Sequence, residues 1–573
     1  MIQTAALLHG WSGLFSAYAL VQVPLLVALI KSRAPLRKLL LSPLAAAPLT
    51  AAAGLGLSAC AGLFSGLGFA AGELLQFGAG VTFSAVLGYT AGRALARRAC
   101  DASVHQRGAI VTEAGAVAAA RHRSSPAFVR QGSGLTLAGL PMSAEDETKH
   151  FKLIGTTGTG KSTAICEILA AALARGDRAV IADPDGGYLR RFYEPKRGDV
   201  VLNPFESRSA KWDLFAEISN DYDVEQLARS LIPDHEGQDR SWRAYARTFL
   251  SAVTAQAHAA GTRDVNELYR LLVVAGTAEL RTLVGGTPAQ PFLEEHNGRM
   301  FDSIRSVTSS AVSALEYVAR QRSAPLSVRE WVRGTPHGRA AAAHHPTGVL
   351  FMPYRAGQIA ALRSTISAWM RLGIFEAMNR EEEGQPLWFV IDELDALGQI
   401  DGLKDALARL RKFGGRCVLG FQSVAQVSST YGSGEAQTLV ENCGTTLILR
   451  CSASEHGGTS RFASRLIGER QVTRIATSRS RRAGDLLSSI TRAEHVSVES
   501  AVMSSQIEQL PDLAGYLKLA SRPEWRRVRL QPRSERERAG TVRQAATTSR
   551  GFAHEPPAPS PQQRAADGGL GLD

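Results

Sequence analysis

A glycine-rich segment at 155–162 has the residue types that bind phosphate groups. Its sequence, GTTGTGKS, matches the pattern GxxxxGK followed by Ser or Thr without a mismatch. The glycines let backbone N–H groups wrap the phosphates, Lys161 reaches the β- and γ-phosphates, and the Ser162 hydroxyl can ligate Mg²⁺. The segment therefore predicts a site for ATP and Mg²⁺. The expected nucleotide-binding residues are Gly155, Thr156, Thr157, Gly158, Thr159, Gly160, Lys161, Ser162 and Thr163.

An acidic pair far downstream would complete this site. The run LWFVI at 387–391 is typical of a buried parallel strand, and it ends in Asp392 and Glu393. We expect Asp392 to hold the metal through water and Glu393 to polarise the attacking water as general base. On their own the two acids could also mark a strand that ends in a solvated turn. Together with the glycine-rich segment they predict ATP hydrolysis.

Two further side chains are catalytic candidates. Gln422 follows an apolar strand at 416–420 and could sense the γ-phosphate or place the lytic water; the alternative is a polar cap of the strand. Arg411 lies on an expected helix at 403–413. In ring ATPases an arginine from one subunit completes the site of its neighbour, because the transition state gains charge on the phosphoryl oxygens. The alternative for Arg411 is a solvated basic helix face.

Apolar strands alternate with helical stretches around these motifs. Such alternation predicts an α/β fold with a mainly parallel sheet and helices on both faces. Ligands then bind at the carboxyl ends of the strands, where Lys161, Asp392 and Gln422 all fall. The expected strands are 150–154, 178–182, 199–202, 348–352, 387–391, 416–420 and 445–449, with a short hairpin in 132–140.

About 145 residues separate the strands at 199–202 and 348–352, which is too long for a loop. Their apolar spacing and turn signals predict an inserted all-α domain at 210–325. Trp212 and Trp242 are expected as core anchors of this region rather than as platforms for base stacking. The expected helices are 223–231, 241–258, 265–275, 277–284 and 300–320.

Composition narrows the class of protein. The chain has 573 residues, which suggests three or four units, and 45% of them are hydrophobic. A net charge of +12 favours polyanionic partners, either nucleic acid or an anionic membrane face. The six cysteines include no CxxC pair and no zinc-ligand spacing, so they are expected as buried thiols in a reducing compartment. Residues 1–10 lack the positive start of a cleavable signal peptide.

The N-terminal region has long uncharged runs. Residues 13–30 carry no charge, and 39–92 carry only Glu73. Basic clusters follow each run, at 31–38 and 93–98, and the positive-inside rule places both in the cytoplasm. The sequence therefore predicts a membrane anchor; the alternative is a buried helical hairpin of a soluble protein.

The number of membrane passes stays open. Three passes with an outside N-terminus fit the charges, and so do two passes at about 44–70 and 74–92. Several glycines suit close helix packing in this region. They are Gly54, Gly56, Gly62, Gly66 and Gly68.

Contacts to nucleic acid are harder to place. If the chain binds nucleic acid without reading its sequence, as its net charge allows, it needs basic contacts to phosphates. The candidates are the loop at 474–482 and the run at 522–538, although such runs are more often solvated and partly disordered. After residue 531 the chain becomes a Pro-, Arg-, Ala- and Gly-rich tail, which we expect to be disordered and able to bind a partner.

Several of the motifs resemble those of a known family, the type IV coupling proteins of bacterial conjugation, of the TrwB and TraD kind. The resemblance covers residues 1–530, and several of its motifs are unrelated to generic phosphate binding. The motifs are GTTGTGKST at 155–163, ADPDG at 182–186, NPF at 203–205, SAWM at 367–370, LWFVIDELDALG at 387–398, RLRKFGG at 409–415, GFQSVAQVSSTYG at 420–432 and QLPDLAGY at 509–516.

The resemblance implies a RecA-like P-loop ATPase domain and roles for individual residues. Lys161 and Ser162 match the phosphate and magnesium positions, Asp392 and Glu393 match the acidic pair, and Arg411 resembles the arginine that acts on a neighbouring subunit. Gln422 resembles the glutamine at the end of the next strand. The family usually has two membrane passes with the N-terminus inside, and the charges of this chain depart from that pattern.

The function implied is an ATP-driven coupling protein that delivers single-stranded DNA, with its attached relaxase, to a type IV secretion channel. A docking receptor that uses nucleotide only as a switch, and a chromosome-type DNA translocase, are the alternatives. The implied partners are DNA bound without sequence preference, the relaxosome, channel components and further copies of the chain, six by resemblance. The implied location is the bacterial inner membrane, with the ATPase domain in the cytoplasm.

The predicted organisation has four parts. They are a transmembrane anchor at 1–98, a nucleotide-binding domain at 99–209 and 326–530, an inserted all-α domain at 210–325, and a tail at 531–573.

Overall fold

The computed structural model of the chain divides it into two compact units, Met1–Arg107 with Arg470–Glu499, and Gly108–Glu469 with Ser500–Asp573. The expected tail beyond residue 532 and residues 481–482 of the expected basic loop at 474–482 lie outside what the structure describes. The structure describes residues 11–32, 34, 36–60, 69–97, 104–112, 134–234, 239–334, 348–380, 384–454, 458–480 and 489–532.

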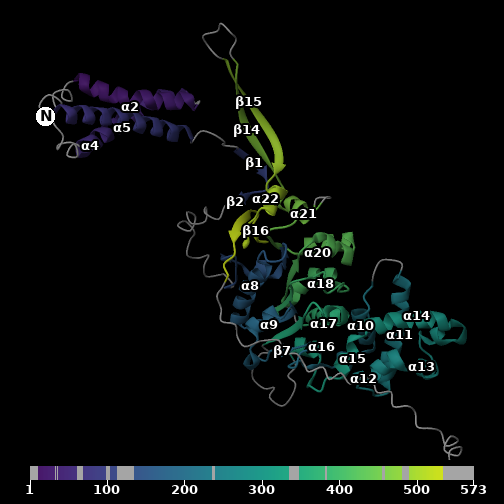
Figure 1. Cartoon of the computed structure of the whole chain (residues 1–573). Helices are drawn as coiled ribbons and strands as arrows, with labels where there is room; N and C mark the ends of the chain where they lie inside the picture. The colour runs from purple at the N-terminus through teal and green to yellow at the C-terminus, as the bar shows by residue number, and fades with distance from the viewer. Residues whose placement is uncertain are drawn as a thin grey trace, which may run out of the picture. The chain divides into compact units, whose positions relative to one another are not determined.

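The larger unit is built on a sheet of ten strands in the order β2-β17-β16-β13-β5-β12-β11-β6-β10-β7 (Figure 1). The seven strands from β13 to β7 run parallel, as predicted. One strand, β12, separates β5 from β11, so the phosphate-binding and acidic motifs end at the same edge. These strands are β5 (Phe151–Ile154), β6 (Arg178–Pro184), β7 (Val200–Val201), β10 (Val349–Tyr354), β11 (Leu387–Ile391), β12 (Gly415–Phe421) and β13 (Thr445–Ile448).

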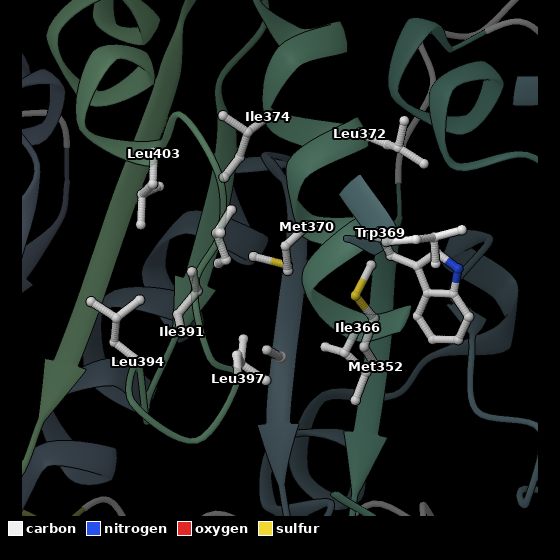
Figure 2. Close-up of a cluster of buried hydrophobic side chains, with 14 of the residues drawn as sticks. Met352, Ile366, Trp369, Met370, Leu372, Ile374, Ile391, Leu394, Leu397 and Leu403 are labelled. Carbon is white, nitrogen blue, oxygen red and sulfur yellow. The ribbon is translucent and has the colours of Figure 1, made fainter. Parts of the chain in front are cut away.

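Alternate side chains of the parallel strands enter two separate apolar layers. In β6, Ala179 and Ile181 belong to one buried cluster, whereas Val180 and Ala182 belong to the other. Helix α8 (Lys161–Arg175) contributes to the first layer and α17 (Ile359–Ala377) to the second, where its side chains meet those of β10 and β11 (Figure 2). Burial on both faces explains why these strands are continuous apolar runs rather than alternating ones.

Three strands on one side of the sheet were not predicted. β16 (Ala514–Lys518) lies antiparallel to both β13 and β17 (Trp525–Arg529), and β2 (Val111–Thr112) pairs with β17. The interpretation of 522–538 as a solvated run is therefore wrong for its first part. Arg526 lies in β17 and pairs with Glu524 at 2.9 Å.

The helices of the expected insertion lie between two short strands, β8 (Lys211–Trp212) and β9 (Pro325–Leu326). These two strands pair in parallel, which brings the two ends of the insertion together. Trp212 is buried, as predicted, but Trp242 is 36% exposed and packs only at the surface against Tyr245. The single helix expected at 300–320 is broken in two. The helices are α10 (Asp221–Leu231), α11 (Arg240–Ala259), α12 (Val265–Tyr269), a π-helical turn η5 (Arg270–Val274), α13 (Thr277–Leu283), α14 (Gly298–Ala311) and α15 (Ala314–Ala319).

Other elements connect these layers. The hairpin expected in 132–140 is present as β3 and β4. The remaining elements are β3 (Thr136–Leu137), β4 (Leu140–Pro141), α7 (Ala144–Thr148), α9 (Gly187–Phe192), η3 (Pro195–Arg197), η4 (Phe215–Glu217), η6 (Gln290–Leu293), η7 (Glu295–Asn297), α16 (Val328–Arg333), α18 (Leu403–Leu410), η8 (Arg411–Phe413), α19 (Val424–Tyr431), α20 (Ser433–Asn442), α21 (Gly458–Ile467) and α22 (Ser504–Glu508).

The smaller unit contains the N-terminal helices. Helix α5 packs closely on α2, because a Cβ on Gly88 or Gly92 would lie within 2.7 Å of the α2 backbone. Gly54, expected at such a contact, has open space around it. Within the described part of the chain, none of the helices has both the length and the apolar character needed to span a bilayer. The helices are α2 (Trp11–Lys31), α3 (Leu36–Leu40), α4 (Ser42–Cys60) and α5 (Phe69–Arg97).

The same unit contains a three-stranded sheet that the sequence did not suggest. Its order is β1 (Val104–Gly108), β14 (Glu469–Ser480) and β15 (Ser489–Ser500). Arg474, expected in a loop, lies on β14 and pairs with Glu499 of β15 at 2.6 Å. The side chain of Arg474 is 61% exposed in this pair.

Candidate nucleotide site

The glycine-rich segment forms a tight loop between β5 and α8. Gly158 and Gly160 have φ angles of 78° and 117°, which residues with a Cβ rarely adopt. A Cβ on Gly155 would lie 2.8 Å from the Leu449 side chain, so this position also needs glycine for space. The loop therefore has its shape because of the glycines that the sequence motif contains.

Lys161 lies at the first position of α8, turned back over the loop. Its Nζ donates to Gly155 O at 2.7 Å and its side chain is almost fully buried. Burial lowers the pKa of Lys161, and the nearby carboxylates of Asp392 and Glu393 oppose that shift. A partly desolvated ammonium group at the start of a helix is well placed for phosphate.

One pocket joins the two motifs that the sequence separates by more than 200 residues. Its walls come from the loop, the first turn of α8, the ends of β11 and β12, and a downstream turn. The lining residues are Thr157, Gly158, Gly160, Lys161, Ser162, Thr163, Asp392, Glu393, Gln422 and Leu513.

Asp392 lies on the floor of this pocket, directly after β11. Its Oδ2 accepts hydrogen bonds from Ser162 Oγ at 2.8 Å and from the Tyr188 hydroxyl at 2.7 Å. Its Oδ1 is buried and has no hydrogen-bond partner among the described residues. A buried carboxylate oxygen without a donor, beside a serine hydroxyl, fits a hard divalent cation such as Mg²⁺.

Glu393 faces the pocket and contacts Gln422. Gln422 Nε2 donates to Glu393 Oε1 at 2.8 Å, and Thr157 Oγ1 donates to Gln422 Oε1 at 3.0 Å. Burial and the neighbouring Asp392 raise the pKa of Glu393, while the Gln422 bond lowers it. A chain of hydrogen bonds thus joins the loop to the candidate general base through one amide.

Arg411 does not line the pocket of its own chain. It lies exposed on η8, just after α18. The buried His150, whose burial lowers its pKa to about 4, fixes α18 to the sheet. His150 Nδ1 accepts from Cys417 N at 3.1 Å, so Nε2 carries the proton and donates to Leu407 O at 2.8 Å.

The structure separates the nine loop residues into two groups. Gly155, Thr156 and Thr159 shape the loop without lining the pocket; Thr159 Oγ1 donates to Thr156 O at 2.7 Å. The other six line it.

Two contributors were missed by sequence reasoning. Leu513 lines the pocket, has a backbone φ angle of 65° and belongs to the motif QLPDLAGY. Tyr188 follows the motif ADPDG. Both motifs were visible, but neither indicated a contact with the site.

Comparison with known proteins identifies the family. The sequence model of the family described as "Type IV secretion-system coupling protein DNA-binding domain" matches residues 134–531. The chain belongs to the type IV coupling protein family. It is 30% identical over 391 residues to coupling protein TraD of Escherichia coli (strain K12), a match that covers 68% of the chain and 53% of TraD. The chain thus matches only about half the length of TraD.

Solved structures of another coupling protein have the same fold. The unbound monoclinic form of the bacterial conjugative coupling protein TrwBdeltaN70 is 30% identical, with a TM-score of 0.67 over 77% of this chain and 96% of that one. TrwB in complex with ADP and Mg²⁺ gives a TM-score of 0.65 over 77% and 98% of the two chains. TrwB with the non-hydrolysable ATP analogue ADPNP also gives 0.65, over 76% and 96%. The α/β P-loop fold with a mainly parallel sheet that the sequence predicted therefore agrees with these neighbours.

Proposed function

We propose that this coupling protein binds MgATP in the pocket and hydrolyses it. The observation that carries the proposal is the single pocket that Lys161, Ser162, Asp392, Glu393 and Gln422 line together. The complexes of TrwB with ADPNP and with ADP and Mg²⁺ support the same ligand here. Bound Mg²⁺ would neutralise phosphate charge during phosphoryl transfer.

Each of these pocket residues has its own role in the proposed reaction. Lys161 holds the β- and γ-phosphates, and Ser162 and Asp392 hold Mg²⁺. Glu393 accepts the proton of the attacking water, and the raised pKa of its carboxyl group makes it a stronger base than a solvated glutamate. Gln422, bonded to Glu393 and to the loop, orients the carboxylate or senses the γ-phosphate.

We further propose that hydrolysis drives DNA towards a type IV secretion channel. The family description and the net charge of +12 support a polyanionic substrate. The charge is unevenly distributed: residues 210–325 contain 12 Lys and Arg against 15 Asp and Glu, so the positive excess lies elsewhere in the chain. We therefore place sequence-independent phosphate contacts outside the all-α insertion, and the relaxase arrives attached to the transferred strand.

Assembly and location complete the proposal. The exposed Arg411, outside its own pocket, supports a homo-oligomer, a hexamer by family resemblance, in which it reaches the site of a neighbour. The uncharged runs at 13–30 and 39–92, with basic clusters after each, support a place at the bacterial inner membrane with the ATPase domain in the cytoplasm. Labelling of single introduced cysteines by a membrane-impermeant reagent would test the location.

The decisive test compares wild type with Glu393→Gln. We expect single-stranded DNA to stimulate ATP hydrolysis by the wild-type chain, and Glu393→Gln to bind ATP but to lose both hydrolysis and DNA transfer between cells. If Glu393→Gln transferred DNA at the wild-type rate, the motor proposal would be wrong, and the chain would act as a docking receptor that nucleotide switches.

A further inference from the structure

Tyr188 reaches the floor of the nucleotide pocket from a different element than the residues that line it. It lies in α9, its side chain is 3% exposed, and its hydroxyl donates to Asp392 Oδ2 at 2.7 Å. The ring belongs to the apolar cluster on the α8 side of the sheet. Its polar tip thus ends on the carboxylate assigned to Mg²⁺, while its body is fixed by packing.

The turn before α9 aims this hydroxyl. Asp185 and Gly186 have φ angles of 57° and 67°, which reverse the chain after β6. The Asp183 carboxylate then accepts from Tyr188 N at 3.0 Å and from Leu189 N at 2.7 Å. The sequence ADPDGGY therefore fixes both ends of the tyrosine: its backbone on Asp183 and its hydroxyl on Asp392.

Tyr188 also determines which oxygen of Asp392 is free. Oδ2 already accepts from Tyr188 and from Ser162, whereas Oδ1 has no hydrogen-bond partner among the described residues. A Cβ on Gly420 would lie 3.1 Å from Oδ1, so β12 closes one side of this oxygen. Without the Tyr188 hydroxyl, the Asp392 carboxylate would break one hydrogen bond fewer when it rotates, so its orientation would be held less firmly.

We propose that Tyr188 is a positioning residue for the magnesium site, which holds the Asp392 carboxylate in the orientation that receives the ion. The inference rests on the magnesium-nucleotide binding proposed above. Hydrogen bonds of this kind to a metal-binding carboxylate commonly affect metal affinity by 10- to 100-fold when they are removed. Tyr188 would act through Asp392 and would not touch the nucleotide.

The test is Tyr188→Phe, which removes the hydroxyl and keeps the ring. Binding of a fluorescent ATP analogue is titrated with Mg²⁺, and separately measured in EDTA, on the full chain. We expect the Mg²⁺ concentration for half-maximal enhancement of binding to rise roughly tenfold, with the affinity in EDTA unchanged. Electron paramagnetic resonance of Mn²⁺, used in place of Mg²⁺, should report the same weakening without any hydrolysis.

Tyr269→Phe is the matched control, because the Tyr269 hydroxyl also bonds a carboxylate, Glu316 at 3.5 Å, but in the all-α insertion. It should leave the Mg²⁺ titration unchanged. Asp183→Asn weakens the hydrogen bonds that the Asp183 carboxylate accepts from Tyr188 N and Leu189 N. It should shift the Mg²⁺ titration in the same direction, and it serves as the test if Tyr188→Phe does not fold.

The outcomes separate the two proposals. A wild-type chain that binds no nucleotide would contradict the proposed function. A wild type that binds MgATP, with an unchanged Mg²⁺ titration in Tyr188→Phe, would overturn the role of Tyr188 alone. Equal losses of affinity in Mg²⁺ and in EDTA would also overturn it, because they would indicate general damage to the pocket.

Discussion

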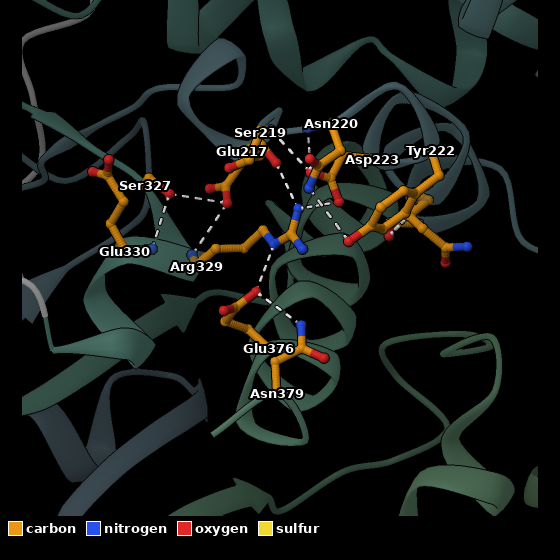
Figure 3. Close-up of polar contacts among 12 residues, drawn as sticks. Glu217, Ser219, Asn220, Tyr222, Asp223, Ser327, Arg329, Glu330, Glu376 and Asn379 are labelled. Atoms are coloured by element: carbon orange, nitrogen blue, oxygen red, sulfur yellow. Dashed lines mark hydrogen bonds and ion pairs between the residues drawn. The ribbon is translucent and has the colours of Figure 1, made fainter. Parts of the chain in front are cut away.

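Two of the carboxylate groups in the larger unit have different roles. One is the pair Asp392 and Glu393 in the nucleotide pocket. The other is the junction cluster, formed by Glu217, Asp223 and Glu376 around Arg329, where α10 meets α16 and α17 (Figure 3). Arg329 pairs with Asp223 at 2.5 Å and with Glu376 at 2.8 Å.

The two groups differ in the partners of their carboxylate oxygens. In the junction cluster, Asp223 Oδ1 accepts no hydrogen bond within the described part of the chain but lies 2.5 Å from Arg329 Nη1. Glu217 accepts from Trp212 Nε1 at 2.9 Å, Val328 N at 2.7 Å, Arg329 N at 3.1 Å and Ser327 Oγ at 3.0 Å. Asp392 keeps one oxygen without a hydrogen-bond partner among the described residues and lines a pocket.

A raised pKa does not distinguish them. Burial raises the pKa of Glu217 to about 7, and burial also raises the pKa of Glu393. A carboxylate with a shifted pKa therefore indicates a reactive site only where a ligand can reach it and one of its oxygens still lacks a partner. By that criterion we propose the pocket as the reactive site, whereas the junction cluster joins the insertion to the helices that cover the sheet.

Arg329→Met should give the largest effect on stability. It leaves the buried Asp223 without its cation, whereas Glu376 keeps Arg333 at 2.6 Å; an unpaired buried charge typically costs roughly 3–5 kcal/mol. Urea unfolding would measure the loss, and nucleotide affinity of the folded protein should stay at the wild-type value. Arg320→Ala, which breaks the exposed pair with Glu316, is the control and should cost under about 1 kcal/mol. Equal losses in the two variants would remove the distinction drawn for the junction cluster.

Lys161→Ala should show the converse pattern. Removing a preorganised cation from the transferred phosphate should lower kcat by roughly 100- to 1000-fold. The midpoint of thermal unfolding without nucleotide should remain near the wild-type value, because the ammonium group is bonded only to loop carbonyls. Retained hydrolysis would show that the pocket is not the catalytic site.

Gln422→Ala should produce a smaller change in the same assay. It cuts the link between Thr157 and Glu393 but leaves in place the groups proposed to hold the phosphates and the metal, Lys161, Ser162 and Asp392. We expect kcat to fall by roughly tenfold with ATP affinity kept, the pattern of an interaction used in the transition state. A change confined to affinity would instead make Gln422 a binding residue.

The pH-dependent part of the effect of Glu217→Gln on stability should be the smallest change. Because the pKa of Glu217 is raised to about 7 from 4.5, the folded chain holds a proton that the unfolded chain releases between these values. The contribution of Glu217 to the free energy of unfolding is therefore fully present below pH 4.5 and declines as the pH rises to 7. Glutamine does not titrate, so the wild-type advantage over the variant in urea unfolding should be smaller at pH 8 than at pH 5. A constant difference would contradict a raised pKa.

The sequence predicted the parallel part of the fold because its signals are local. Each strand buried on both faces is an apolar run, as in β11, and the glycine-rich loop has a fixed spacing. The antiparallel strands β16 and β17 were not predicted. β16 is held by its long-range pairing with β13, β17 is held by its pairing with β16, and β17 contains three arginines.

The sequence predicted those site residues whose type and spacing are specific to one chemical role. Lys161, Asp392 and Gln422 were placed together because parallel strands end at one edge. Tyr188 and Leu513 were not, since a tyrosine hydroxyl and an apolar side chain carry no spacing signal, and only the turn at Asp185 and Gly186 directs Tyr188 to Asp392.

The most direct measurement is a structure of the full chain determined with a non-hydrolysable ATP analogue and Mg²⁺. It should show the triphosphate under the loop at 155–162, Lys161 on its β- and γ-phosphates, and the ion between Ser162 and Asp392. A nucleotide bound elsewhere, or an ion that neither Ser162 nor Asp392 approaches, would contradict the proposal that the two motifs form one hydrolytic site.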